Sequence, residues 1–347
     1  MDIKKMHGPW VMCVPISNLS IEKDGLAQEH QVDRVTFIGA AKLPYKRKKL
    51  GIPMRISTIQ NKYKTIVDDM LKTNNTYAII RFNGCIEDEE TKILARIREE
   101  LSILSLSQIG YAKRRSNFAP SIAREHSVGI TEYFVVNSND SSLMSSLRLR
   151  GKVGPLVLNR RWKHFQQKAF YFNLLKIIRG EIGVARQWKE DLRNAAIMAG
   201  QSQRIIDLPQ AFLWNMIALE LLLTQQKDKY AKELPKRAEA MLGWVNYWRD
   251  DDYEIKINDL YQKRCELVHG GVRENILIDD LLFSDDLLLN LFINIVGHID
   301  IFRSKKELIG FSEKVHAEHI LGVQPKVRPK SFKYFKREYT EFDYQQF

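Results

Sequence analysis

The hydrophobic pattern of this chain changes near residue 157, and this change limits the folds that the chain can adopt. Before residue 157, short segments rich in β-branched and aromatic residues alternate with helical patterns, which is typical of an α+β domain. Strands are expected at 11–16, 32–38, 54–59, 77–82 and 130–136, and helices at 61–71 and 88–104. The polar run at 137–142 is expected to form a loop.

After residue 157 the strand signals fade and helical periodicity dominates. Helices are expected at 160–179, 183–200, 208–226, 231–247, 254–269, 285–304 and 305–320. Six glycine and proline residues fall at or near the ends of these patterns: Gly180, Gly200, Pro209, Pro235, Gly270 and Gly271. The expected fold class is therefore mixed, with an N-terminal α+β domain followed by an all-α region. We expect four parts: an α+β sensor or recognition domain at 1–150, a helical connector at 151–204, a helical bundle at 205–322 and a basic, aromatic tail at 323–347.

Composition is that of an ordinary globular protein with a basic surface. Of the 347 residues, 44% are hydrophobic and 28% are charged, which suits a chain of about two domains. The formal net charge of +12 favours a polyanionic partner, nucleic acid before a membrane surface, although many basic proteins bind neither. No signal-peptide pattern and no apolar run of about 18 residues is present, so a cytoplasmic protein is expected. Three widely spaced cysteines favour neither a disulfide framework nor a structural zinc site.

One segment carries a pair of residues with chemistry of its own. Arg264 and His269 are separated by four residues at the end of an expected helix that two glycines terminate, in the sequence YQKRCELVHGG. Histidine can transfer protons near neutral pH, and a guanidinium can hold a phosphate with a fixed fork of donors. Five positions correspond to about 140° around an α-helix, so the two side chains converge only if the arginine reaches along the helix or the histidine lies at a loosened end. Gly270 is the expected C′ residue. The alternative is a capping histidine beside a structural arginine.

Arg264 lies on the apolar face of its helix and needs an anionic partner there. The expected helix at 208–226 is apolar nearly all round between 211 and 224, with Glu220 as its only charged residue in that stretch. We expect Glu220 to pair with Arg264 or Arg237, the alternative being a surface lysine at the helix rim. Asn215 on the same helix either reaches the site or is a satisfied buried amide. Cys265 is expected to be a small buried side chain rather than a nucleophile.

At these residues the chain resembles the HEPN superfamily, in particular its ApeA-like branch. The matching elements are the Arg264-x(4)-His269-Gly-Gly motif, the Ala218-Leu219-Glu220 pattern followed by Leu222, and the helix between them at 234–245. The resemblance covers about 205–320. It implies an up-and-down bundle of four or five helices that forms a homodimer, with two Arg/His motifs facing each other. Active members are metal-independent endoribonucleases of toxin–antitoxin and antiphage (antiviral defence, abortive infection) systems; other relatives have lost activity and bind RNA, nucleotide or a partner protein.

The resemblance also implies roles for three residues. His269, from one or both subunits, would act as base and acid while an RNA 2′-hydroxyl attacks its own 3′-phosphate. Arg264 would stabilise the pentavalent phosphate, and Glu220 would orient Arg264. The products would carry 2′,3′-cyclic phosphate and 5′-hydroxyl ends, and DNA would resist cleavage. No cofactor is implied; the partners would be RNA (tRNA or mRNA) and an antitoxin or trigger protein.

Basic clusters at 42–49, 113–115, 160–163 and 326–337 could follow a phosphate backbone. The residues expected to bind RNA are Lys263, Arg160, Arg161, Lys163, Lys333 and Arg337. Each cluster could equally be a solvated face, and the tail could be an arm that packs on a partner subunit. His316 and His319 lack a third ligand, so no metal site is expected. The rival functions are a non-catalytic HEPN module and a DNA- or RNA-binding regulator acting through the N-terminal part.

Overall fold

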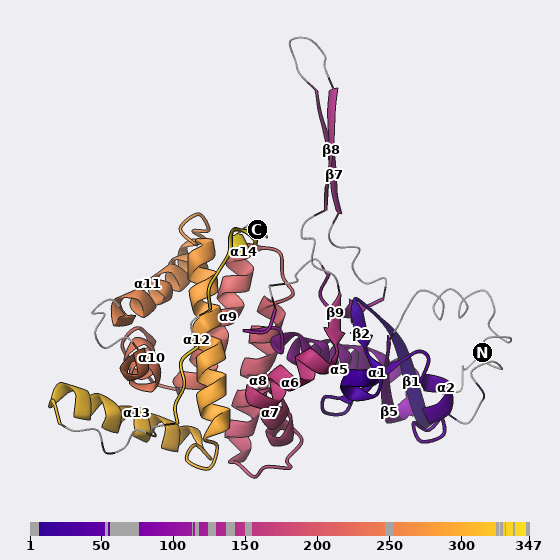
Figure 1. Ribbon diagram of the computed structural model, residues 1–347, viewed down its shortest axis with the longest axis horizontal. Helices are drawn as coiled ribbons and strands as arrows, with labels where there is room; N and C mark the ends of the chain where they lie inside the picture. The colour runs from indigo at the N-terminus through magenta and orange to yellow at the C-terminus, as the bar shows by residue number, and fades with distance from the viewer. Residues whose placement is uncertain are drawn as a thin grey trace. The chain divides into compact units, whose positions relative to one another are not determined.

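The computed structural model describes residues 7–52, 55, 76–112, 114, 118–123, 130–136, 143–149, 155–246, 253–323, 326, 329, 331–335 and 337–344. The chain divides into two compact units (Figure 1). The first comprises Met1–Leu101 with Arg114–His164, and the second comprises Ser102–Lys113 with Phe165–Gln345. Residues 165–204 of the expected connector thus belong to the second, helical unit. The expected strand 54–59, apart from residue 55, lies outside the described residues, as do the expected helix 61–71 and loop 137–142.

The first unit is built on an antiparallel sheet of five strands in the order β3-β4-β5-β1-β6. The two long strands, β1 and β5, pair along their length with Val11 opposite Arg81 and Cys13 opposite Ile79. The strands are β1 (His7–Ser17), β3 (Glu29–Gln31), β4 (Thr36–Gly39), β5 (Thr76–Cys85) and β6 (Ser121–Ile122). Two smaller sheets pair β2 (Leu19–Ile21) with β9 (Leu156–Leu158) and β7 (Ile130–Val136) with β8 (Leu143–Leu149). The helices are α1 (Lys23–Leu26), α2 (Leu43–Lys46) and α5 (Ile86–Leu106), the last of which continues into the second unit.

Three expected strands, 11–16, 77–82 and 130–136, are confirmed as parts of β1, β5 and β7. The expectation of one strand at 32–38 was wrong, because β3 and β4 form a hairpin there with its turn at 32–35. A buried carboxylate explains the turn. Glu100 of α5 accepts the backbone N–H groups of Asp33, Arg34 and Val35 at 2.9–3.1 Å, which satisfies donors that a continuous strand would present to a neighbour.

This carboxylate gives the first unit a pH-sensitive element. Burial raises the pKa of Glu100 to about 7 from its ordinary value of 4.5, although the three N–H groups oppose the rise. Because the folded-state pKa lies above the unfolded value, the stability that this proton contributes is present below pH 4.5 and is lost as the pH rises through about 7. We expect the 13C resonance of this carboxyl, assigned with Glu100→Gln, to titrate near pH 7. A midpoint at the ordinary value would contradict the expectation.

The second unit is helical in the part that the structure describes. Its helices are α7 (Tyr171–Ile178), α8 (Arg186–Ser202), α9 (Leu208–Leu223), α10 (Tyr230–Asn246), α11 (Tyr253–Cys265), α12 (Ile278–Gly297), α13 (Lys305–Ile320) and α14 (Glu341–Tyr344), with α6 (Arg160–Lys168) leading into it. The expected bounds of the helix at 305–320 are confirmed. The expected helix at 160–179 is instead broken at Phe170, a buried residue whose ring stacks on Phe292 of α12 at 5.1 Å. The expected helix at 285–304 begins earlier, at Ile278, and ends at Gly297.

Two expected helix-end residues lie inside helices. Pro235 is within α10, and Gly200 is within α8. A Cβ built on Gly200 would lie only 1.8 Å from the carbonyl oxygen of Ser102. The backbones of α8 and of the chain at Ser102 therefore touch, and only glycine allows this approach.

The coarse expectation of an α+β N-terminal part and a mostly helical remainder is confirmed. Within the residues that the structure describes, no helix combines the length and the apolar character needed to cross a membrane.

Candidate active site

Helix α9 carries the carboxylate of the site. Asp207 caps its N-terminus by accepting the N–H of Gln210 at 3.1 Å, and Pro209 lies in its first turn. The helix contacts α8, α10, α11, α12 and α13, which explains why its sequence is apolar nearly all round. Glu220, its only charged residue, is 9% exposed near the C-terminal end.

Glu220 forms a two-point ion pair with Arg264 of α11. The Nε atom of Arg264 lies 3.0 Å from Oε1 of Glu220, and Nη2 donates to Oε2 at 3.3 Å. The pairing expected from the burial of both charges is therefore confirmed. Burial raises the pKa of Glu220, and the guanidinium opposes this rise. The contact holds the guanidinium against the carboxylate and uses one of its five N–H donors, because Nε and Oε1 lie close together without a hydrogen bond.

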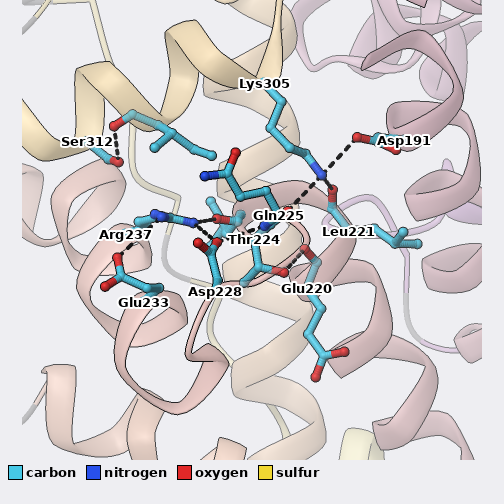
Figure 2. A network of polar contacts seen from close by, with 12 residues as sticks. Asp191, Glu220, Leu221, Thr224, Gln225, Asp228, Glu233, Arg237, Lys305 and Ser312 are labelled. Carbon is cyan, nitrogen blue, oxygen red and sulfur yellow. Dashed lines mark hydrogen bonds and ion pairs between the residues drawn. The ribbon is translucent and has the colours of Figure 1, made fainter. Parts of the chain in front are cut away.

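The alternative partner, Arg237, is committed elsewhere. It bonds to the carbonyl oxygen of Leu223 and pairs with Asp228 and Glu233. Figure 2 shows the carboxylate of Glu220 directed away from this group. Of the two expected cationic partners of Glu220, Arg264 is therefore the one that forms the ion pair.

Helix α11 does not end as a regular α-helix. It continues as a π turn, Glu266–Gly270, which contains His269. The i→i+5 hydrogen bonds widen such a turn, so residues five apart return to nearly the same side of the helix, and such turns are frequent at functional sites. The turn thus reduces the separation of about 140° that a regular α-helix would impose on Arg264 and His269.

The helix stops at Gly271 rather than at Gly270, so the expected C′ residue was wrong by one position. Gly271 has a φ of +68°, and its N–H is directed at the carbonyl oxygens of Glu266 and Leu267. The extra residue of the π turn accounts for the shift, because it moves the left-handed residue one position along the chain.

The site opens to solvent at the π turn. His269 is exposed, as are the apolar side chains of Val268 and Leu277. The loop that follows is held on both sides: Asn275 donates to Glu266 at 2.9 Å, and Arg273 pairs with Asp207 at the start of α9. A half-buried guanidinium held by a buried acid can bind an anion, and an exposed imidazole five residues further along the chain can move a proton.

Lys263, expected to bind RNA, already has two carboxylate partners. Its Nζ atom lies 2.8 Å from Asp259 and 2.9 Å from Asp280 of α12. Burial lowers the pKa of Lys263, but the hydrogen bonds to these carboxylates outweigh it and raise the pKa above its ordinary value. Lys263 therefore links α11 to α12, and two carboxylates balance its positive charge.

Arg160, Arg161 and Lys163 lie in the first turn of α6, in the first unit. Both arginines are exposed and border an open cavity of about 470 Å³ that Glu22 and Asp24 also line. The lining of this cavity is thus mixed in charge. A polyanion approaching these arginines would meet two carboxylates as well.

The tail residues Lys333 and Arg337 lie in a segment that packs against α12. The backbone of Lys333 is bonded to Asn294, and Arg337 donates to the carbonyl oxygen of Ala112 at 3.0 Å. The two interpretations of the tail, as a basic cluster along a phosphate backbone and as an arm against another subunit, did not include this packing on its own chain.

The remaining candidates have structural environments. Asn215 is a buried amide whose nitrogen donates to Ser284 and Asp285 of α12 at 2.8 Å, while its Oδ1 has no hydrogen-bond partner among the described residues, so the amide is only half satisfied. Cys265 is half-buried. In the part of the chain that the structure describes, His316 and His319 belong to no group of three or more His, Cys, Asp or Glu that could hold a metal ion.

A charged group near Glu220 was missed. Lys305 at the start of α13 bonds to Asp191 at 2.8 Å and to the carbonyl oxygens of Leu221 and Thr224 at the end of α9 (Figure 2). Glu220 and these residues line a cavity of about 580 Å³. Nothing in the sequence brings α8, α9 and α13 together; the only signal is a lysine at the first position of a helix, where cations are disfavoured.

No family model, no curated protein and no solved structure matches this chain.

Proposed function

We propose that this chain is a metal-independent endoribonuclease of the HEPN type and that its helical part is an up-and-down HEPN bundle. The observation that carries the proposal is the Glu220–Arg264 ion pair, followed five residues later by an exposed His269 on a π turn. A buried acid that aligns a guanidinium beside an accessible imidazole suits the stabilisation of a phosphate and the transfer of a proton.

In the proposed reaction an RNA 2′-hydroxyl attacks the adjacent 3′-phosphate, and the 5′-oxygen of the next nucleotide leaves. His269 removes the proton from the attacking hydroxyl, and an imidazolium protonates the leaving oxygen. A homodimer formed through the helical bundle supplies a His269 for each role. Arg264 binds the phosphate oxygens as their charge increases, and Glu220 is a positioning residue that keeps the guanidinium aligned.

The biological setting that follows is bacterial antiphage defence or a toxin–antitoxin pair in the cytoplasm. The RNA substrate is tRNA or mRNA, and the α+β unit recognises a trigger, an antitoxin protein or the RNA itself. Among the basic residues, Arg160, Arg161 and Lys163 are the stronger candidates for contact with RNA, because the charge of Lys263 is already paired.

Cleavage in the presence of EDTA tests this function. We expect the purified chain to cut tRNA or mRNA without a divalent metal and to leave 2′,3′-cyclic phosphate and 5′-hydroxyl ends, identified by end-labelling before and after phosphatase treatment. A substrate with one 2′-deoxy nucleotide at the cut site should stay intact there, because it lacks the nucleophile. An Arg264→Ala preparation purified in parallel reveals contaminating nucleases.

The second candidate is a non-catalytic HEPN module that binds RNA, nucleotide or a partner protein. The observation that favours it is that the guanidinium of Arg264 is already paired with Glu220, to which its Nη2 donates at 3.3 Å. RNA that stays intact in EDTA, in magnesium and in cells overproducing the chain, together with retained RNA binding, would decide for this candidate.

A further inference from the structure

The end of the chain follows helix α12. Residues 331–335 and 337–344, hereafter the C-terminal segment, run beside α12 (Figure 1). The segment starts at the C-terminal end of the helix, where Ser331 meets His298 at 2.7 Å, and finishes at its first turn, where Tyr344 donates to Asp279 at 2.7 Å. The segment therefore runs antiparallel to the helix over nearly its whole length.

Two buried asparagines of α12 bind the backbone of this segment. Asn294 donates to the carbonyl oxygen of Lys333 at 2.8 Å and accepts the N–H of the same residue at 2.9 Å. Asn290 does the same with Phe335, at 2.9 Å and 2.6 Å. Each amide side chain therefore occupies both hydrogen-bonding groups of one peptide residue, as a neighbouring β-strand would.

The spacing of these contacts matches a helix to an extended chain. Four residues of an α-helix advance about 6 Å along its axis, and two residues of an extended strand advance about 6.6 Å. Asn290 and Asn294 are four apart on α12, and their partners, Lys333 and Phe335, are two apart. Because the contacts use backbone groups, this part of the recognition does not depend on the side chains of the segment.

An aromatic side chain anchors one end of the segment. Phe332 is 6% exposed and packs among three rings. Their centroids lie 4.6 Å (His298), 5.6 Å (Phe311) and 6.1 Å (Phe302) from that of Phe332. Burying a phenylalanine among aromatic rings is a strong and specific contact.

A tyrosine anchors the middle. The hydroxyl of Tyr339 donates to Asp286 at 2.6 Å and contacts the carbonyl oxygen of Leu282 at 3.0 Å. Burial and the nearby carboxylates raise the pKa of Tyr339, which keeps the hydroxyl protonated as a donor. The face of α12 thus recognises an extended peptide with a buried phenylalanine, two backbone-bound residues and a tyrosine.

We propose that this face of α12 is a binding site for an extended peptide, that the chain's own C-terminal segment occupies it, and that the same segment from a second copy of the chain can take its place. If the segment left, Asn290 and Asn294 would lose their four hydrogen bonds to its backbone, and of the two amides only Asn290 would keep a bond within α12, to the carbonyl oxygen of Asp286. An occupant that makes the same contacts restores all four bonds, and a second copy of the chain supplies an identical segment. The contacts on α12 are the same whether the segment comes from its own chain or from a second copy. The equilibrium between monomer and exchanged dimer therefore depends on the effective concentration of the chain's own segment at the site.

The exchange joins two copies independently of any contact between their Arg264 and His269 residues. It therefore provides a route to a homodimer that holds whether or not the chain cleaves RNA. Loss of exchange and loss of ribonuclease activity are separate outcomes.

A pair of complementary full-length variants tests the proposal. The first, Phe332→Ala with Tyr339→Phe, has a weakened segment and an intact site. The second, Asn290→Ala with Asn294→Ala, has an intact segment and a weakened site. When the two are co-expressed with different affinity tags, we expect the first variant to co-purify the second in clear excess over pairs of identical variants, because only the mixed pair can fill an intact site with an intact segment.

A fluorescent synthetic peptide of residues 329–344 provides the second measurement. The segment-weakened variant should bind it at least about tenfold more tightly than the wild-type chain, whose own segment competes, and adding Asn290→Ala and Asn294→Ala should abolish that gain. Circular dichroism melting checks that each variant is folded. A folded segment-weakened variant that binds no peptide, or peptide binding without co-purification of the mixed pair, would overturn the exchange.

Discussion

Replacing His269 with alanine should lower the initial rate of RNA cleavage in EDTA at least about 100-fold, since a positioned general acid or base contributes roughly 10²–10⁴. The residue is exposed on the π turn, so its removal leaves no buried partner without a hydrogen bond. The melting temperature should therefore stay close to that of the wild type, and the loss would be chemical rather than structural.

His319→Ala is the matched control for this change. His319 is also an exposed histidine of the helical unit, in the last turn of α13, and its replacement should leave the cleavage rate within about twofold of the wild type. Equal rates for wild type and His269→Ala, measured on the same RNA, would remove His269 from the reaction. Arg264→Ala is a less clean variant, because it leaves the buried Glu220 carboxylate without its cation.

Gly200→Ala should reduce the free energy of unfolding of the helical unit by about 3 kcal/mol or more. Overpacking a core costs about 1–3 kcal/mol when side chains can adjust, but here the added methyl group would lie 1.8 Å from a backbone oxygen, that of Ser102. Helix α8 and the segment at Ser102 would have to separate. Urea unfolding followed by circular dichroism at the helical band measures the loss.

Gly310→Ala is the matched control for the glycine variant. Gly310 is also inside a helix, α13, and a Cβ there would meet nothing within 4 Å. Alanine at that position should increase the free energy of unfolding by roughly 0.5–1 kcal/mol through helix propensity. If both alanines shifted the unfolding midpoint in the same direction, the close approach at Gly200 would not be the cause.

The spacing of apolar residues predicted many of the strands and helices, because it reflects which face of a single strand or helix is buried. The strand at 130–136 and the helix at 305–320 follow from their periodicity alone. The hairpin at 29–39 could not be predicted in this way, because its turn depends on Glu100, more than sixty residues away in sequence. The early start of α12 was missed although Asp280, which accepts the N–H of Leu277 at 2.8 Å, is a capping residue.

The candidate site was predictable where it depends on charge and burial. One carboxylate in an apolar helix and one guanidinium on an apolar face require each other, which predicts the contact between Glu220 and Arg264. The π turn has no comparable local signature. In the sequence, Asn290 and Asn294 are only polar residues within an expected core helix. Their role in binding the C-terminal segment could not be predicted, because their partners lie about 40 residues later in the chain.

The antiparallel course of the C-terminal segment has a practical consequence for fusion proteins. Tyr344 is held at Asp279, next to Asp280, which binds Lys263 beside Arg264. A purification tag or fluorescent protein appended after Phe347 would therefore begin three residues beyond this anchor, and its bulk would oppose the seating of Tyr344 at the start of α12.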